Sequence, residues 1–465
     1  MNNDKKAFIS GIWYTVSNFF VRGIGLILTP IITRLLTKGE YGLYNNYTSW
    51  LSIASIFVTL NLEPTLISAR FDFEDKFDRY ILSMLALCTL STSIWAIVIN
   101  GFSEVFVNFT GVSQIDLNVM LVNLLFLSAI NLFQARERYL FEYKASVITS
   151  LVLSISSAIA AVSFVLLFSN KVDGMIIGSA LPTILIGVSF FVFFVIKAKK
   201  IDVKYWKYAL PLCIPYIPHL LAGTMLSTMD RVMINKMCGS EDTAVYSLAY
   251  SCGTVVALVA TSINSAFAPW LGEKISEKNY RDVRKVSKPY VCFFIILAVG
   301  VLLFSPELLF VLGGEKYMEA KYVIGPVAIG CICQFLYTMF VNVEQFKKKT
   351  TGMAIATVIA AAVNFILNCI FIPIFGYLAA AYTTLVGYLV LLLIHMFLVW
   401  KIGMKEIYSY RFIIGSILLS IVIGTGIILT YNHLYIRVVF DVIFLIVLSV
   451  IFVKYRNKLS LLWKK

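Results

Sequence analysis

The sequence predicts an all-α integral membrane protein with about fourteen transmembrane helices. Of its 465 residues 60% are hydrophobic and only 14% are charged, whereas a soluble domain is about 25% charged. Mean hydropathy is +0.86. Apolar runs of roughly 20 residues recur along the whole chain, and each is long enough to cross a bilayer. The runs are continuously apolar rather than alternating, which favours helices over the strands of a membrane barrel.

The predicted spans follow one another with short connections. The first run comes after a short polar segment, MNNDKK, and lacks a small-residue cleavage site. We therefore expect a retained helix rather than a signal peptide. The predicted spans are 8–36, 41–67, 80–101, 117–135, 145–169, 174–197, 209–238, 243–272, 289–312, 320–343, 350–372, 376–400, 412–431 and 436–453.

The loop charges predict the orientation of the chain. With the N-terminus inside, the inside segments carry 30 Lys and Arg residues and the outside loops carry seven. Because inside loops are enriched in Lys and Arg, both termini are expected on the cytoplasmic side of the membrane. The same asymmetry accounts for the net charge of +14. The charge is spread over eight short segments, so nucleic-acid binding is not expected.

A weak internal repeat suggests two halves of similar build. A shift of 202 residues aligns Tyr44 with Tyr246, Gly42 with Ala244, and Gly174 with Gly376. Such an offset is typical of duplicated helical units. We predict a first lobe over 1–200, a second lobe over 201–403, and an extra helical pair with a basic tail over 404–465.

Charged residues inside the spans are the main functional signal. Arg22 lies mid-span in the first helix, and Asp230 and Arg231 lie in the outer part of the seventh. Glu63 precedes Pro64 near the inner end of the second. Charge at bilayer depth costs about 2.5–3.5 kcal/mol or more, so such residues usually face a cavity or a partner. Asp441 is expected at the surface, and the lone His219 and His395 are expected to be packed and neutral.

Helix-breaking residues and small polar residues occur in the first and seventh predicted spans. Proline and glycine bend or interrupt helices, and matching broken helices in two halves indicate a transport path. The predicted hinge residues are Gly23, Gly25, Pro30, Pro215, Pro218 and Gly223. Asn18 and Thr224 are predicted to line the cavity with the two arginines. The eight cysteines are interpreted as small hydrophobes, and no metal site is expected.

Three motifs carry a resemblance to a known family. They are LLTKGEYGLYN at 35–45, DRVMINKMCGSEDTAVYSLAY at 230–250 and NFILNCIFIPIFGYLAAAY at 364–382. With these, the whole chain resembles the polysaccharide-biosynthesis flippases, which move O-antigen or capsule repeat units. Those proteins lie in the multidrug/oligosaccharidyl-lipid/polysaccharide (MOP) superfamily.

The resemblance implies a fold and a function. The fold would be two six-helix lobes in a V around a central cavity, with two extra C-terminal helices. The function would be to flip an undecaprenyl-pyrophosphate-linked oligosaccharide from the inner to the outer leaflet, without catalysis. The implied partners are that lipid-linked sugar, membrane lipids and a polysaccharide polymerase, and the protein would act as a monomer.

Arginine suits the pyrophosphate because its planar fork donates paired, charge-assisted hydrogen bonds. Arg22 and Arg231 would supply one cation from each lobe. The chain has no GxxxxGK[ST] stretch for nucleotide phosphates, so no cofactor is expected. The energy would come from a proton or sodium gradient or from downstream use of the product, and Asp230 or Glu63 is the candidate to carry a coupling proton or sodium.

Three other functions remain open on the sequence alone. A peptidoglycan-precursor flippase would share the fold and the extra helical pair. A cation-coupled drug antiporter of the same superfamily would more naturally carry a carboxylate than Arg22 mid-span. A polysaccharide polymerase or ligase would need a large outside loop, and the outside loops here are short.

Overall fold

The computed structural model describes residues 3–140, 142–349 and 351–463. Within these residues the chain is helical, with short connections and no strand. Contacts divide the chain into two compact units. Unit 1 comprises residues 1–247 and 357–380, and unit 2 comprises residues 248–356 and 381–465. The lobes expected at 1–200 and 201–403 stay a prediction.

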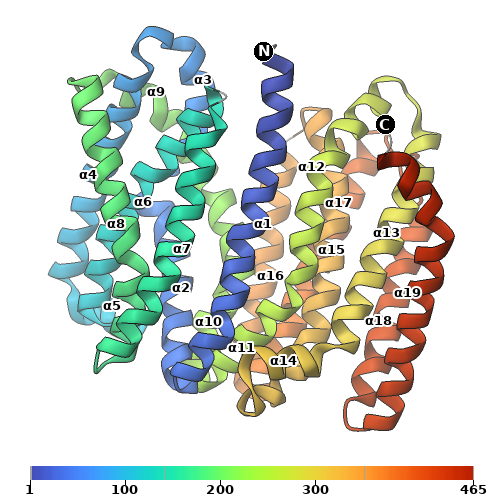
Figure 1. Ribbon diagram of the computed structural model, residues 1–465. Helices are drawn as coiled ribbons and strands as arrows, with labels where there is room; N and C mark the ends of the chain where they lie inside the picture. The colour runs from blue at the N-terminus through green and yellow to red at the C-terminus, as the bar shows by residue number, and fades with distance from the viewer. Residues whose placement is uncertain (1–2, 141, 350, 464–465) are drawn as a thin grey trace. The chain divides into compact units, whose positions relative to one another are not determined.

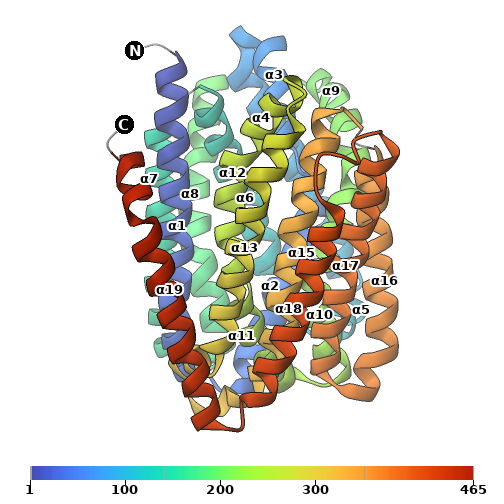
Figure 2. The same ribbon diagram turned by 90° about the vertical axis from the view of Figure 1, so that its right-hand side faces the viewer.

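Unit 1 is built around α8, which packs against α6 and α7, while α1 packs against α7 and α2 against α10. Figures 1 and 2 both show α1 running beside α7. The helices of unit 1 are α1 (Asn3–Leu35), α2 (Lys38–Val58), α3 (Leu66–Asp72), α4 (Phe77–Gly101), α5 (Ser103–Thr110), α6 (Gln114–Tyr139), α7 (Tyr143–Leu167), α8 (Lys171–Ala198), α9 (Lys204–Cys213) and α10 (Ile217–Met237). It also contains the 3-10 turns η1 (Glu63–Thr65), η2 (Glu74–Lys76) and η3 (Ile214–Tyr216), part of α11 (Ser240–Gly253) and most of α16 (Thr351–Phe375).

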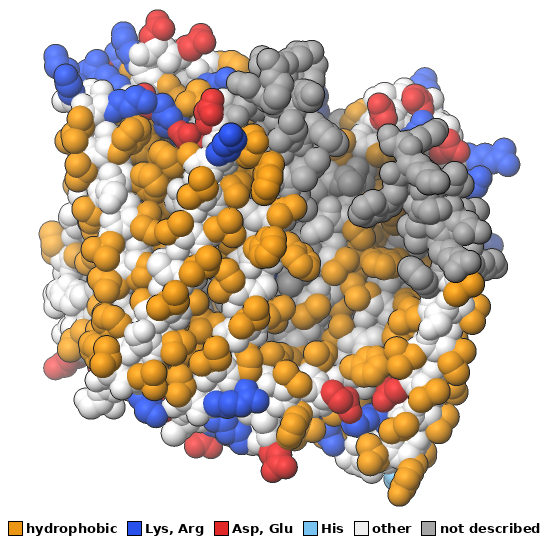
Figure 3. Space-filling view, viewed as in Figure 1, with side chains coloured by type: hydrophobic (Ala, Val, Ile, Leu, Met, Phe, Trp, Pro, Cys, Tyr) orange, Lys and Arg blue, Asp and Glu red, His pale blue; other side chains and the backbone are white. Residues whose placement is uncertain are grey.

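Small residues let α7 and α8 approach closely. A Cβ added at Gly174 would stand 2.6 Å from the Phe164 carbonyl oxygen, and one at Gly178 would stand 2.7 Å from that of Ala160. Residues four apart share a helix face, and such spacing is typical of helix contacts within a membrane. Figure 3 shows hydrophobic side chains along the helices of unit 1, with charged side chains gathered toward their two ends. That distribution fits helices that cross a bilayer.

The first family-like motif builds the start of α2. Thr37 and Glu40 form a capping box, in which the Thr37 N–H donates to Glu40 Oε2 at 2.7 Å and the Glu40 N–H donates to Thr37 Oγ1 at 3.2 Å. Gly42 then lies directly against the backbone of Ser240, the first residue of α11. A Cβ at Gly42 would be 1.7 Å from the Ser240 carbonyl oxygen, so this position requires glycine.

The second predicted span is interrupted earlier than the sequence indicated. We expected a helix over 41–67, but α2 ends at Val58. Leu60 and Asn61 adopt left-handed backbone conformations, with φ of 54° and 47°, which an α-helix cannot accommodate. Glu63 and Pro64 then begin η1, and the segment that η1 opens is bent by 43° from α2.

The structure has a helix in each of the fourteen predicted spans. Among the described residues, 12 helices are long and apolar enough to cross a membrane, or 13 if the bent segment after α2 is counted with it. Of the helices in the fourteen predicted spans, α19 (Leu434–Trp463) is not among these membrane-length helices. It continues through the segment that was expected to be a tail. Residues 464–465 lie outside the described residues.

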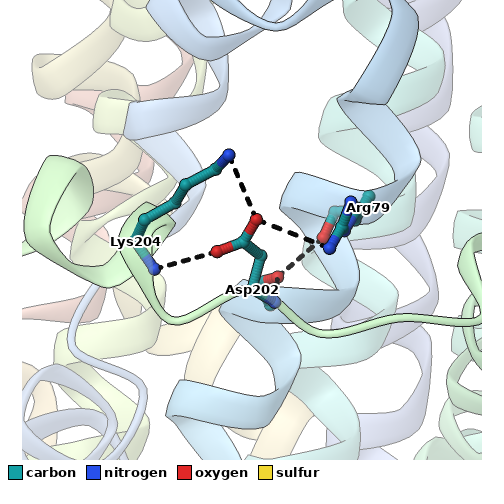
Figure 4. A network of polar contacts seen from close by, with 4 residues as sticks. Arg79, Asp202 and Lys204 are labelled. Atoms are coloured by element: carbon teal, nitrogen blue, oxygen red, sulfur yellow. Dashed lines mark hydrogen bonds and ion pairs between the residues drawn. The ribbon is translucent and has the colours of Figure 1, made fainter.

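The connection between the predicted lobes packs onto unit 1. Tyr205 of α9 is buried against Phe73 and Tyr80, and the Trp206 indole donates to the Ser83 carbonyl oxygen at 2.8 Å. Just before α9, Asp202 lies between Arg79 and Lys204 (Figure 4), at 3.5 Å and 3.3 Å from their side-chain nitrogens. These contacts hold α9 against the end of α4.

Unit 2 is organised around α15, which is buried along most of its length and packs against α12, α13 and α18. At one end, the Tyr431 hydroxyl donates to the Leu302 carbonyl oxygen at 2.8 Å, which ties α18 to α13. The helices of unit 2 are α12 (Val255–Ser276), α13 (Tyr280–Leu303), α14 (Ser305–Gly313), α15 (Lys321–Phe346), α18 (Tyr410–Thr430) and α19, with the turn η4 (Glu315–Ala320) and most of α17 (Tyr377–Lys401).

Candidate functional site

The site with the most defined geometry is centred on Asp230 of α10. Its side chain is 1% exposed although it carries a carboxyl group. The Tyr246 hydroxyl of α11 donates to Asp230 Oδ2 at 2.5 Å. The Asn368 amide of α16 donates to Asp230 Oδ1 at 2.7 Å. Both carboxyl oxygens therefore accept a hydrogen bond from a different helix of unit 1.

Asn364 extends this group by one helical turn. Asn368 Nδ2 lies 3.4 Å from Asn364 Oδ1, and both asparagines are buried. Residues four apart on α16 share one face, so the NxxxN spacing of the third motif presents both amides on the side of Asp230. The result is a buried polar cluster that we call the Asp230 cluster: Asp230, Tyr246, Asn364 and Asn368.

The Asp230 cluster brings a buried carboxyl group together with two amide side chains. A buried carboxylate is costly unless it is paired and hydrogen-bonded, and the two donors offset part of that cost. The cluster contains carboxylate and amide oxygens, which are the ligand types that hard cations prefer. The arrangement can therefore hold a proton on the carboxyl group or a small cation among the oxygens.

Tyr246 and the two asparagines were not assigned to the site from the sequence. Tyr246 was noted only as a repeat position, and the asparagines only as matches to a family pattern. Their distance along the chain from Asp230, 16 and 138 residues, hides the contact. The available signal was polarity: Asn364 and Asn368 are amides within an otherwise apolar helix.

Arg231 and Thr224 lie on the same helix as Asp230. The Arg231 side chain is half-buried. Because each residue of an α-helix is rotated by about 100° from the one before it, Arg231 points in a different direction from Asp230. Thr224 is also half-buried, and its carbonyl oxygen accepts bonds from the hydroxyls of Ser227 at 3.0 Å and Thr228 at 2.8 Å. The hydroxyls of Ser227 and Thr228 are thus turned toward their own helix.

Arg22 and Asn18 lie on α1. Both side chains are exposed, and their spacing of four residues gives them one helix face. The residues around them are apolar and exposed, including Phe19 at 72% and Ile27 at 69%. The structure therefore has an exposed guanidinium within a membrane-length apolar helix.

Glu63 lies apart from the Asp230 cluster. It is the first residue of η1, and its carboxylate is 3.3 Å from Arg138 of α6. About a third of its side chain is exposed. A neighbouring cavity of about 40 Å³ is lined by Glu63, Asn61, Ser128 and Asn131, among others. That space suits one or two waters.

The predicted hinges have two different local structures. The helix α1 continues through Gly23, Gly25 and Pro30 without a break. In the seventh span the α-helix is interrupted. The 3-10 turn η3, which contains Pro215, separates α9 from α10. Pro218 then falls in the first turn of α10, where a missing N–H costs nothing.

Unit 1 also contains an apolar cavity of about 180 Å³. Its walls include Trp50, Phe57, Trp95, Phe106 and Phe109. Such a lining offers no bonds to sugar hydroxyl groups, so this cavity does not suit a saccharide headgroup.

The fold is that of membrane transporters. A lipid II flippase, MurJ, in an inward closed conformation, is similar with a TM-score of 0.74 and 15% identity, over 96% of this chain and 100% of that one. A MOP superfamily transporter from Pyrococcus furiosus is similar with a TM-score of 0.61 and 13% identity, over 88% of this chain and 97% of that one. The chain therefore has the fold of the MOP superfamily transporters.

The family follows from the sequence profile. The profile of the family described as polysaccharide biosynthesis protein matches residues 9–275, more than half of the chain. The chain belongs to this family. The profile described as MatE matches residues 215–370.

Two further proteins are similar in sequence along a large part of the chain. An uncharacterized membrane protein of Methanocaldococcus jannaschii is 22% identical over 464 residues, covering 91% of this chain and 89% of the relative. A probable low-salt glycan biosynthesis flippase of Haloferax volcanii is 25% identical over 219 residues, covering 46% of each chain.

Proposed function

We propose that the protein flips undecaprenyl-pyrophosphate-linked oligosaccharide repeat units from the inner to the outer leaflet of the bacterial cytoplasmic membrane by alternating access. The product would feed O-antigen, capsule or a related surface polysaccharide. Membership of the polysaccharide biosynthesis family supports this role. The observation that carries it is Arg22, an exposed guanidinium within the apolar helix α1.

The chemistry of the substrate explains why such an arginine is useful. A saccharide cannot enter hydrocarbon without losing hydrogen bonds to water, so it needs a polar route. Its pyrophosphate is matched by a guanidinium, which donates two parallel charge-assisted bonds. Asn18 lies one turn from Arg22 and adds an amide on the same face.

Arg231 and Thr224 are proposed to act on the same substrate. The internal repeat aligns Arg22 with Thr224, so Arg231 stands seven residues further along its helix. That distance is about 10 Å at 1.5 Å per residue. Two cations at different depths would let a phosphate pass from one to the other.

The Asp230 cluster is proposed as the coupling site for a proton or sodium gradient. Its buried carboxylate, with donors from two other helices, is suited to bind either cation. Glu63 remains a second coupling candidate. We infer no chemical step and no cofactor, with both termini in the cytoplasm, a monomeric protein and a polysaccharide polymerase as an acceptor of product.

Two other transport functions have a supporting observation each. The similarity to the lipid II flippase over 96% of this chain favours a peptidoglycan-precursor substrate. The MatE match over 215–370 favours a cation-coupled drug antiporter. Flipping of a short-chain lipid-linked oligosaccharide, of lipid II, and of an organic cation can be compared in the same proteoliposomes.

The main test uses Arg22 variants in a strain that depends on this protein for surface polysaccharide. We expect Arg22→Ala to abolish export while the protein stays in the membrane, because both the positive charge and the paired N–H donors of the guanidinium are lost. We expect Arg22→Lys to retain part of the export, because the charge remains. The matched control is Arg34→Ala on the same helix, whose guanidinium donates to the Pro30 carbonyl oxygen at 2.7 Å.

The outcome that contradicts the proposal is also defined. If Arg22 has only a structural role, Arg22→Ala should lower the amount of protein, and the folded remainder should work normally. Normal export from a well-expressed Arg22→Ala protein would rule out the assigned role.

A further inference from the structure

Unit 2 contains a buried acid–imidazole pair that the proposed transport route does not use. Glu344 lies in the last turn of α15, and His395 lies on α17. The His395 Nδ1 is 2.7 Å from Glu344 Oε1, and each side chain is 1% exposed. The other carboxyl oxygen, Glu344 Oε2, is buried without a hydrogen-bond partner among the described residues.

The neighbouring aromatic residues fix this pair in place. The Tyr337 ring stacks on His395, with centroids 5.6 Å apart and planes inclined by 18°. Tyr337 is seven residues before Glu344, which is about two helical turns, so both lie on the same face of α15. The hydroxyls of Tyr408 and Tyr410 are bonded elsewhere, to the carbonyl oxygens of Met339 and Met396.

The charged groups on the surrounding elements have other contacts or lie nearer the surface. On α12, Lys274 pairs with Glu277. On α13, Arg284 pairs with Glu406. The remaining charged residues on α12, α13 and α18, and at the adjoining ends of α15 and α17, are half-buried or exposed: Glu273, Arg281, Asp282, Lys285, Lys288, Lys347, Lys348, Lys349, Lys401, Lys405 and Arg411.

The net charge of the Glu344–His395 pair depends on the number of protons that it holds. With a neutral imidazole and an ionised carboxylate, the pair carries one negative charge. One added proton makes it neutral, either as imidazolium with carboxylate or as imidazole with carboxylic acid. Burial penalises net charge strongly, so the neutral form with one added proton suits a fully buried site. Losing that proton to water would leave a charge that the buried state does not accommodate.

We propose that Glu344 and His395 form a proton-binding site within unit 2, which holds one exchangeable proton while buried and releases it when water reaches the pair. The bound species is the proton itself. Because α15 and α17 each supply one member, release weakens the contact between these helices. As a part of the transport cycle this rests on the proposed function, whereas proton binding by the pair does not.

The experiment measures proton binding directly in the purified, full-length protein in lipid nanodiscs. Infrared difference spectra would be recorded on changing the pH between about 5 and 8, where an imidazole commonly titrates. We expect coupled carboxyl and imidazole bands in the wild type. Both sets should disappear in Glu344→Gln and in the double variant Glu344→Gln/His395→Gln, and the imidazole bands should disappear in His395→Gln. Asp230→Asn, which alters a carboxyl group in unit 1, should leave these bands in place.

The results separate the proton site from the transport function. Bands that persist in Glu344→Gln, or a wild type with no pH-dependent bands from these residues, would overturn the proposal. The double variant keeps the test valid if a single variant folds poorly, because it holds no titratable group at the pair. In proteoliposomes with equal pH on both sides, we expect Glu344→Gln to lose the dependence of the flipping rate on that pH, while the response to an imposed gradient, which is assigned to Asp230, remains. Absence of flipping in the wild type, with the bands present, would count against the proposed function alone.

Discussion

The Tyr246 hydroxyl donates a hydrogen bond of 2.5 Å to Asp230 Oδ2, and thereby links α11 to α10 within unit 1. The bond explains why an acidic residue is retained at 1% exposure in an apolar helix. A hydrogen bond to a charged group contributes about 1.5–3 kcal/mol. Together with the bond from Asn368, it gives the carboxyl group a fixed orientation toward α11 and α16.

The first prediction concerns Asp230 as a coupling residue. Asp230→Asn keeps the shape of the side chain but removes its titratable and cation-binding group. We expect flipping in proteoliposomes to become independent of both the pH gradient and the sodium gradient. The measurement is the rate of flipping with each gradient imposed separately.

A matched control for this change is Asp116→Asn. Asp116 is another buried carboxyl group of unit 1, at 4% exposure, and it takes part in the cap of α6. Its replacement changes only the acceptor of the hydrogen bond that the Ser113 hydroxyl donates at 2.7 Å, so stability should change little and the ion dependence should remain. If both variants keep the wild-type ion dependence, Asp230 is not the coupling residue.

The second prediction concerns the glycine in the first motif. A Cβ at Gly42 would lie 1.7 Å from the Ser240 carbonyl oxygen, which is backbone and cannot rotate away. We expect Gly42→Ala to destabilise unit 1 by about 1–3 kcal/mol, as overpacking does, and to lower the apparent melting temperature in detergent.

The control for Gly42 is a glycine with open space around it. A Cβ at Gly23 would meet nothing within 4 Å, so Gly23→Ala should leave the melting temperature unchanged or raise it. If Gly23 is a hinge, the same variant should nevertheless slow flipping. Equal melting temperatures for the two variants would contradict the steric explanation.

The fold class followed from the sequence because apolar runs are a local signal. Each predicted span contains a helix, and the family indicated by the motifs is confirmed. Local backbone breaks were harder to predict. The left-handed conformations at Leu60 and Asn61 end α2 early, although neither residue type requires that conformation.

The candidate site was only partly predictable for a related reason. Asp230 and Arg22 could be singled out because a charge in an apolar run is visible in the sequence. Glu344 was not, because it follows the end of a predicted span and resembles an ordinary loop residue. Its pairing with His395, 51 residues away, depends on tertiary packing.

The third prediction concerns the topology. The loop charges predict that both termini are inside and that the connection near Gly314 is outside. Reporter fusions after Lys200 and after the last residue should read cytoplasmic, and a fusion at Gly314 should read external. An external C-terminus would mean that α18 or α19 does not cross the membrane.

The last prediction concerns the pH dependence of stability at Asp202, which lies outside the membrane-length helices. Burial acts to raise the pKa of this carboxyl group, but hydrogen bonds and charge from Lys204, with the charge of Arg79, outweigh it and lower the pKa below its ordinary value of 3.8. The ionised form is therefore favoured in the folded state. Its contribution to stability is present above the unfolded pKa and is lost as the pH falls through the folded pKa.

We therefore expect Asp202→Asn to lower the melting temperature slightly at neutral pH and to have no effect once the pH is below the folded pKa. The effect should be small, because the contacts lie at the protein surface and are screened by salt. The measurement is thermal unfolding of both proteins across this acidic range, with Asp75→Asn, an exposed carboxyl group in η2, as the control. A difference between Asp202→Asn and the wild type that persists at the acidic end would show that Asp202 acts through its shape rather than its charge.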